Sequence, residues 1–248
     1  MAQDLSGKVA VIVGGSGGIG AATARSLADA GARVVVTYRS DRDGAETLVS
    51  GLAGSGHLAL PADVADSATL NALAGTVAER CGRADILVNA AGFTAAVPAQ
   101  DLDALDDDLI DRLFQVNWRG CFATIRAFRP LLKAHGDGLI VNISSIAGMT
   151  GAGSNLAYAA AKAGIDALTK GLARSLAPDI RVVAVSPGMV DTGFVPGRDA
   201  AANAKAAQTI PLRRVADPAD VADAVLACAT LLRYSTGTIV VTDGGRSL

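Results

Sequence analysis

Short apolar runs alternate along this chain with longer segments of helical periodicity, and the alternation never breaks. The runs are rich in β-branched residues and span residues 9–13, 34–37, 57–60, 86–88, 139–143, 182–185 and 238–241. The helical segments span residues 19–30, 43–52, 67–80, 105–134, 157–177 and 218–232. Runs that are apolar on both faces are typical of parallel strands covered on both sides. The order therefore predicts an α/β fold, a doubly wound parallel sheet of about seven strands with helices on both faces.

Local signals support these boundaries. Asp66 and Asp217 stand directly before two helical segments and are expected to be helix N-caps, the second followed by Pro218. Because no linker or repeat interrupts the pattern, we expect a single α/β domain over residues 1–248. The least regular stretch is 186–212, and within it we expect residues 189–212 to form a substrate-binding loop or lid.

The composition excludes several classes of protein. The 248 residues are 50% hydrophobic and 19% charged, which is too apolar for a mainly disordered chain. A formal net charge of -2 lacks the basic excess of most nucleic-acid binders. No apolar run approaches the roughly 18–20 residues of a spanning helix, so we expect a cytoplasmic protein with no membrane partner. Three scattered cysteines and two isolated histidines predict no disulfide framework and no metal site.

A glycine-rich turn follows the first predicted strand and opens the first helix. Two registers fit: Gly15, Gly17 and Gly20 match G-x-G-x-x-G, whereas Gly14, Gly18 and Gly20 match G-x-x-x-G-x-G. Either register lets the backbone turn sharply and aim free N–H groups at a pyrophosphate. We therefore expect this turn to bind a dinucleotide through Gly14, Ser16, Gly17, Gly18, Ile19 and Gly20.

The end of the second strand is expected to select the cofactor. NAD-binding folds usually place a carboxylate there for the ribose 2′-hydroxyl, but this chain has Tyr38 and then Arg39 and Ser40. A guanidinium fork and a hydroxyl suit a 2′-phosphate. We therefore expect NADP(H) as the preferred cofactor with NAD(H) as the alternative, although Asp41 and Asp43 close by weaken the argument.

A serine, a tyrosine and a lysine suggest the chemistry. Tyr158 and Lys162 are four residues apart on a predicted helix, which places them on one face, and Ser145 follows the fifth strand. A phenol whose pKa is lowered by a nearby ammonium suits proton transfer to or from an alcohol or carbonyl oxygen. A serine hydroxyl beside that oxygen would stabilise its developing charge.

At this point the chain resembles the short-chain dehydrogenase/reductase family, in its short single-domain branch, and in particular its 3-oxoacyl-ACP reductase-like and carbonyl reductase members. The likeness runs from Gly7 to Gly245. The motifs that carry it are Gly14-x-x-x-Gly18-x-Gly20, Asp63-Val64, Asn89-Ala90-Ala91-Gly92, Asn117, Ser145 with Tyr158 and Lys162, and Pro187-Gly188 with Thr192. One departure is Gly17, which stands where NADP-preferring members often carry Arg or Lys.

The resemblance implies a role for each matching residue and a Rossmann-like fold. Tyr158 would be the general acid/base, and Lys162 would lower its pKa and bind the nicotinamide ribose. Ser145 would orient the substrate oxygen, and Asn117 would hold a water that relays protons from Lys162. The other implied cofactor contacts are Asp63, Val64, Asn89, Ala90, Gly92, Pro187, Gly188, Val190 and Thr192.

The sequence leaves the substrate open between two readings. Met189, Phe194, Val195 and Ile210 in the expected lid suit an apolar carbonyl compound, with Phe93, Thr94 and Val97 as another wall. Alternatively, Arg198, Lys205, Arg213 or Arg214 would meet an anionic substrate or a carrier protein.

The expected function is an NADP(H)-dependent oxidoreductase that transfers hydride between a nicotinamide and a carbonyl or secondary alcohol. The alternative is a dinucleotide-binding sensor or interaction protein that has lost catalysis, and a dehalogenase-like lyase is a third hypothesis. The complete glycine turn and Lys162 argue against the lyase. By analogy with the family, the long segments 105–134 and 157–177 are expected to pair across a two-fold axis in a homotetramer, or in a homodimer.

Overall fold

Seven parallel strands form one sheet in the computed structural model, which describes residues 4–248. The strands are β1 (Val9–Val13), β2 (Arg33–Tyr38), β3 (Leu58–Pro61), β4 (Ile86–Asn89), β5 (Gly138–Ile143), β6 (Ile180–Pro187) and β7 (Ile239–Thr242). They lie in the order β3-β2-β1-β4-β5-β6-β7, and every neighbouring pair is parallel. The predicted doubly wound, Rossmann-like sheet is confirmed.

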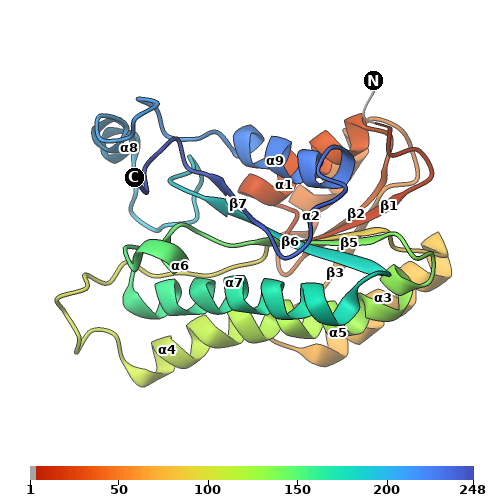
Figure 1. The fold of residues 1–248 in the computed structure, drawn as a ribbon, viewed down its shortest axis with the longest axis horizontal. Coiled ribbons are helices and arrows are strands. Elements are labelled where there is room, and N and C mark those ends of the chain that lie inside the picture. Colours follow the sequence, from red (N-terminus) through yellow and green to blue (C-terminus); the bar gives the residue numbers. More distant parts are fainter. Residues whose placement is uncertain (1–3) are drawn as a thin grey trace.

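Helices cover both faces of this sheet (Figure 1). One face carries α1 (Gly18–Asp29), α2 (Arg42–Ser50) and α9 (Pro218–Thr230); the other carries α3 (Ser67–Cys81), α5 (Gly120–Lys133) and α7 (Leu156–Leu176). The residues of β1 alternate between the two cores, with Ala10 and Ile12 on the α1 side and Val9, Val11 and Val13 on the other. This is why the strand is apolar at every position.

The strand order reverses between β1 and β4. From β1 the chain builds outward to β3, crosses back by α3 and continues outward from β4 to β7. In such sheets a crevice opens at the carboxyl ends of the strands where the order reverses, and ligands bind there. The fold therefore points to the carboxyl ends of β1 and β4 as the place of a site.

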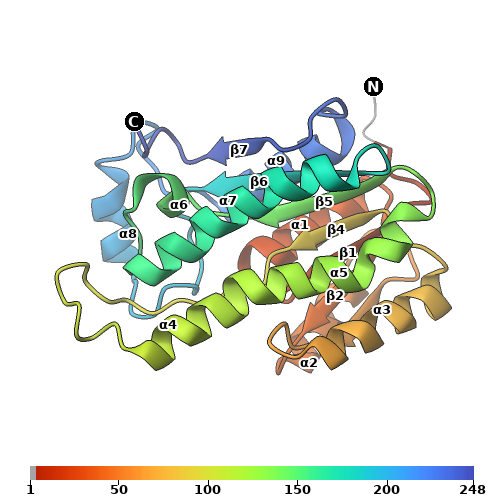
Figure 2. The ribbon, with the colours of Figure 1, turned by 60° about the horizontal axis from the view of Figure 1, so that its bottom comes forward.

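The long helix predicted over residues 105–134 is interrupted. The structure has α4 (Asp107–Phe114), a π-helical turn η1 (Gln115–Arg119) and then α5, which follow one another as one rod in Figure 2. The extra residue of a π turn rotates one side chain out of the regular period. Here Asn117 lies in that turn and is buried, which the 3.6-residue period alone did not predict.

The segment 186–212 is more regular than expected. It contains α8 (Ala200–Ala207), an alanine-rich helix whose N-cap Asp199 accepts a hydrogen bond from Ala202 N at 2.8 Å. All of its residues lie outside the core, so alanine propensity and the cap maintain it rather than burial. A short helix, α6 (Ala147–Thr150), was also not expected. The expected N-caps Asp66 and Asp217 are confirmed, the latter in a capping box with Asp220.

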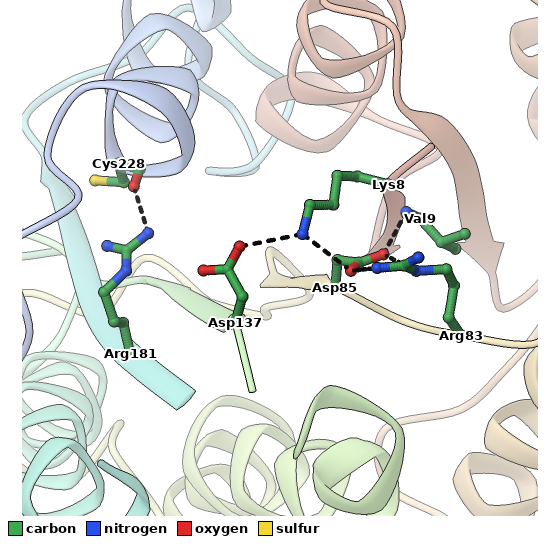
Figure 3. A network of polar contacts seen from close by, with 7 residues as sticks. All are labelled: Lys8, Val9, Arg83, Asp85, Asp137, Arg181 and Cys228. Carbon is green, nitrogen blue, oxygen red and sulfur yellow. Dashed lines mark hydrogen bonds and ion pairs between the residues drawn. The ribbon is translucent and has the colours of Figure 1, made fainter. Parts of the chain in front are cut away.

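A buried carboxylate fastens the amino-terminal edge of the sheet (Figure 3). Asp85, directly before β4, is 2% exposed and accepts hydrogen bonds from Val9 N at 2.8 Å and from Arg83 Nε at 2.8 Å. Lys8 Nζ lies 3.4 Å from the same carboxylate and 3.1 Å from Asp137. Burial raises the pKa of Asp85, but the Arg83, Val9 and Lys8 contacts outweigh it and leave the pKa below its ordinary value.

Replacing Asp85 by Asn is therefore expected to lower the free energy of unfolding by about 3 kcal/mol at neutral pH, since two cations lose a buried partner. A carboxyl with a lowered folded pKa stabilises the fold above its ordinary pKa of about 3.9 and loses that effect as pH falls through the folded value. The gap between variant and wild type should thus shrink in acid. Urea unfolding across pH measures this. Glu46→Gln, which breaks the exposed pair with Arg42, is the control and should cost at most about 0.5 kcal/mol. Equal losses for the two variants would contradict the assignment.

No helix within residues 4–248 has the length and apolar character needed to cross a bilayer. The same residues contain no cluster of His, Cys, Asp and Glu side chains suited to a metal ion.

Candidate active site

The glycine turn lies at the carboxyl end of β1, where the strand order reverses. Gly14 has a φ of +80°, and a Cβ there would lie 2.5 Å from the backbone of Ala91. A Cβ on Gly20 would lie 2.2 Å from the Gly14 carbonyl oxygen, and Gly18 has a φ of +46°. A Cβ on Gly17 would meet no protein atom within 4 Å. Because Gly17 belongs only to the G-x-G-x-x-G register and has room for a side chain, the structure favours the register of Gly14, Gly18 and Gly20.

This turn has the features of an anion cradle. Helix α1 begins at Gly18, and no side chain caps its first N–H groups. A helix start of this kind presents free donors and a partial positive charge to a phosphate. Gly17 borders the open cavity, so the backbone is accessible there. These residues fit the pyrophosphate of a dinucleotide.

Arg39 lies on the same cavity just past the end of β2. Its side chain is exposed, and none of the ion pairs within residues 4–248 involves it. Asp41 is the N-cap of α2 and accepts from Gly44 N at 3.0 Å, so its carboxylate is engaged by the helix. Asp43 does not line the cavity. Of these two acids, Asp41 therefore borders the cavity beside Arg39 and Asp43 does not.

One cavity of about 880 Å³ joins the glycine turn to the region of Tyr158. Its wall includes nearly all of the residues that the sequence singled out. These are Gly14, Ser16, Gly17, Gly18, Ile19, Gly20, Arg39, Ser40, Asp63, Val64, Ala90, Gly92, Ser145, Tyr158, Lys162, Pro187, Gly188, Val190 and Thr192. Segments from six strand ends thus meet around a single space.

Ser145, Tyr158 and Lys162 come together at this cavity. Tyr158 and Lys162 lie one turn apart on α7, which begins at an Asn155 cap that accepts from Tyr158 N at 2.7 Å. Ser145 follows β5 and lies beside the Tyr158 hydroxyl. The Lys162 Nζ lies 5.7 Å from the Tyr158 ring centroid and donates to the Ile143 carbonyl at 2.7 Å. The arrangement places a phenol, an ammonium and a hydroxyl around one point.

Burial shifts the pKa values of Tyr158 and Lys162. It raises the pKa of Tyr158 to about 12, although the hydrogen bond with Ser145 lowers it. It also lowers the pKa of Lys162 to about 8, against the field of Asp166. The expected lowering of the Tyr158 pKa by Lys162 does not appear, because the ammonium is directed at the Ile143 carbonyl. The phenol is therefore protonated at neutral pH.

Two of the singled-out residues lie behind the cavity wall. Asn117 is buried; its Oδ1 accepts from Phe93 N at 3.2 Å, and its Nδ2 donates to the carbonyls of Phe93 and Leu113 at 2.9 Å each. With both amide hydrogens used, only an Oδ1 lone pair is left for a water, so its relay role stays a prediction. Asn89 donates to Asn142 Oδ1 at 2.9 Å and joins the ends of β4 and β5.

Arg112 and Asp166 carried no signal in the sequence, whereas Phe93 and Phe194 were expected as walls of the substrate region. The Arg112 guanidinium carbon lies 4.3 Å from the Phe93 ring centroid, and both residues line the cavity. Phe194 lies against Tyr158 with ring centroids 5.9 Å apart. Asp166 is a buried carboxyl one turn beyond Lys162, and its Oδ1 has no hydrogen-bond partner among the described residues. Only packing brings these side chains to the site, so a helix period does not reveal them.

The arginines of the expected lid differ in their placement. Arg198 lines the cavity, whereas Lys205 does not. Arg213 donates to the Gln208 carbonyl, and Arg214 is paired with Asp220. Of the four cations named from the sequence, one therefore faces the site.

Comparison with known proteins bears on this geometry. Residues 14–247 match the family model described as enoyl-(acyl carrier protein) reductase. A granaticin polyketide synthase putative ketoacyl reductase 2 of Streptomyces violaceoruber is 40% identical over 97% of this chain and 96% of its own. The chain belongs to the short-chain dehydrogenase/reductase family.

Two further comparisons extend this assignment. A cis-4-hydroxycyclohexanecarboxylate dehydrogenase of Sinomonas cyclohexanicum is 37% identical over 99% of this chain and 98% of its own. The crystal structure of a putative short-chain dehydrogenase/reductase from Burkholderia xenovorans has a TM-score of 0.89 at 37% identity, covering 96% of this chain and 97% of that one. This short-chain dehydrogenase/reductase is an NAD(P)-dependent oxidoreductase acting on CH–OH and C=O groups. The comparisons therefore support an enzyme rather than a sensor without catalytic activity.

Proposed function

We propose that this enzyme reduces a ketone to a secondary alcohol with NADPH and that Tyr158 supplies the proton. The observation that carries the proposal is the single cavity that joins the glycine turn to Ser145, Tyr158 and Lys162. When bound, the reduced nicotinamide supplies the hydride. Tyr158 gives its hydroxyl proton to the carbonyl oxygen, which becomes the alcohol hydroxyl, while Ser145 donates to the same oxygen and stabilises its charge.

The other residues would bind and orient. Lys162 lines the cavity, and its ammonium would bind the hydroxyls of the nicotinamide ribose. Asp63 accepts a hydrogen bond from Ala65 N at 2.8 Å with one carboxylate oxygen, and its other oxygen would accept from the adenine amino group. The remaining proposed cofactor contacts are the backbone and small side chains at Val64, Ala90, Gly92, Pro187, Gly188, Val190 and Thr192, and residues 189–212 would act as the lid.

Reduction needs the protonated form of the Tyr158 phenol. Burial holds the pKa of Tyr158 near 12, so the proton needed for reduction is in place at neutral pH. Oxidation of an alcohol needs the phenolate, and we propose that it becomes faster as pH rises. Loss of absorbance at the reduced-nicotinamide band with a panel of neutral and charged ketones tests the proposal. No consumption of NADPH with any ketone, in a protein that binds NADPH, would contradict it.

Preference for NADPH is proposed to come from Arg39. Arg39→Ala should weaken NADPH binding by at least about 10-fold and leave NADH binding within 2-fold, since one charge-assisted pair with the 2′-phosphate is lost. Fluorescence titration with both dinucleotides measures this. Arg42→Ala is the matched control, because Arg42 is exposed on α2 and does not line the cavity. Equal NADPH affinity in wild type and Arg39→Ala would remove Arg39 from the binding site.

We also propose a homotetramer, with a homodimer as the lesser assembly. The edge strand β7 exposes Val241, and Leu231, Leu232 and Tyr234 lie exposed just before it. An apolar sheet edge of this kind is usually covered by a partner, and a second copy would bring its own such edge. Light scattering during size exclusion should give about four times the mass of one chain. A monomer at micromolar concentration would contradict this.

A further inference from the structure

Charge is divided unevenly along the cavity. Its only carboxylates within the described part of the chain, Asp41 and Asp63, follow β2 and β3. The charged side chains that line the other half, from β4 to β7, are all cationic: Arg112, Lys162, Arg198 and Arg246. Lys162 has an assigned role, but the three arginines have none. An array of cations in a concave site attracts an anion.

Arg112 is held ready for a ligand. Its guanidinium stacks on Phe93 at 4.3 Å, and the Phe93 backbone is fixed in turn by the paired hydrogen bonds of Asn117. No ion pair within residues 4–248 includes Arg112, although α4 carries three aspartates. A stacked guanidinium keeps its N–H groups free at the ring edge and offers them in a fixed fork.

Arg198 reaches the cavity from another element, the segment between β6 and α8. One of its terminal N–H groups donates to the Val190 carbonyl, which fixes the side chain. Its Nε is buried and has no hydrogen-bond partner among the described residues. Partial burial of a guanidinium without a counter-ion is unfavourable, so an anion bound beside it would be stabilising. Figure 2 shows α4 and α8 at the same end of the molecule.

Aromatic rings also line this half of the cavity. Phe194 lies against Tyr158, and a Cβ on Gly92 would lie 3.4 Å from the Phe194 ring, so the lid closes over the segment that carries Phe93. These rings suit an apolar body next to the reacting carbon. The arginines that line the same half of the cavity suit a charge on that body away from its carbonyl group.

We infer that the substrate is a ketone with an apolar body and a remote anionic group, a carboxylate or a phosphate, and that Arg112 and Arg198 bind this anionic group. The inference rests on the proposed reduction at Tyr158 and names the class of substrate for it. Carboxylate and phosphate both accept two parallel hydrogen bonds from a guanidinium. Their sources differ, since a small keto acid carries the first and a pantetheine-phosphate thioester the second.

The test compares probes that differ in charge alone. 4-Oxocyclohexanecarboxylate is compared with its carboxamide, and the acetoacetyl thioester of pantetheine 4′-phosphate with that of pantetheine. In the wild type at least one charged probe should have a kcat/KM at least 10-fold above its neutral partner, and that pair identifies the source. Arg112→Gln and Arg198→Gln should each lower this ratio about 10-fold. Arg112→Gln should leave the neutral probe and the KM for NADPH unchanged. Arg198→Gln also frees the Val190 carbonyl at the proposed cofactor site, so it is judged by the ratio of charged to neutral probe alone.

Controls separate this inference from the proposed function. Arg174→Gln, an exposed arginine of α7 away from the cavity, should leave the ratio unchanged. Equal kcat/KM for charged and neutral probes would overturn the anionic substrate while leaving the reductase in place. A rise in the KM for NADPH in Arg112→Gln would show that this arginine serves the dinucleotide phosphates instead. Calorimetric titration of the enzyme–NADP+ complex with the same probes gives a readout without turnover, and equal affinities there would also overturn the inference.

Discussion

Tyr158→Phe is expected to reduce ketone turnover by about 10²- to 10⁴-fold, the usual contribution of a general acid. The substitution removes the proton donor and leaves the ring, which packs with Leu113, Ala157 and Phe194. Thermal stability and NADPH affinity should therefore stay close to those of the wild type. Steady-state kinetics with saturating NADPH, together with a binding titration, measure the two effects separately.

The matched control is Tyr234→Phe, which removes the same hydroxyl from a fully exposed ring. It should leave kcat unchanged. A variant at Tyr158 that kept wild-type turnover would mean that another group, such as a water, delivers the proton. The pH profile gives a second check: burial holds the pKa of Tyr158 near 12 but lowers that of Lys162 to about 8. Reduction should therefore be flat in mild acid and at neutral pH and decline above about pH 8, where Lys162 loses its charge.

The second large effect is expected at the glycine turn. In Gly20→Ala the new methyl would lie 2.2 Å from the Gly14 carbonyl oxygen and 2.8 Å from the Gly15 Cα, and both are backbone atoms that cannot swing away. The turn must open, which we expect to cost about 3 kcal/mol of stability. It should also weaken NADPH binding by at least 100-fold, because the backbone N–H groups of the turn would no longer point toward the pyrophosphate.

Gly75→Ala is the control for this substitution. Gly75 lies within α3, and a Cβ there meets no atom within 4 Å. It should raise the free energy of unfolding by roughly 0.5–1 kcal/mol, the helix propensity difference. Urea unfolding and NADPH titration of both variants decide the matter. A Gly20→Ala protein of wild-type stability and affinity would show that the turn tolerates a side chain.

Much of the fold could be predicted because local and long-range preferences agree. Most of the seven strands are rich in β-branched residues, and the Asp66 and Asp217 caps stand where the helices begin. The π turn around Asn117 was missed because it comes from the burial of one amide against Phe93, which no period encodes. Helix α8 was missed because small residues near glycines and a proline read as a loop, although Asp199 caps them.

The candidate site likewise contains residues that the sequence predicts and residues that it does not. Gly14, Tyr158 and Lys162 carry a spacing whose chemistry is readable, so the sequence predicts them as a group. Arg112 has no such spacing. It reaches the cavity through the packing of α4 against Phe93, and its part in the site became visible only with the structure. Phe194 was expected from the apolar residues of the lid, but its contact with Tyr158 was not.

The Asp85 cluster and the cavity lie at opposite ends of the same strands: Asp85 precedes β4, whereas Ala90 and Gly92 follow it on the cavity wall. The ion pairs of Asp85 that stabilise the sheet therefore share no residue with the cavity at the carboxyl ends of the strands. Exchanges among the arginines and aromatic rings of the lid should alter which ketone is accepted at little expense to folding. Such a division would let a single scaffold acquire new substrates one loop at a time.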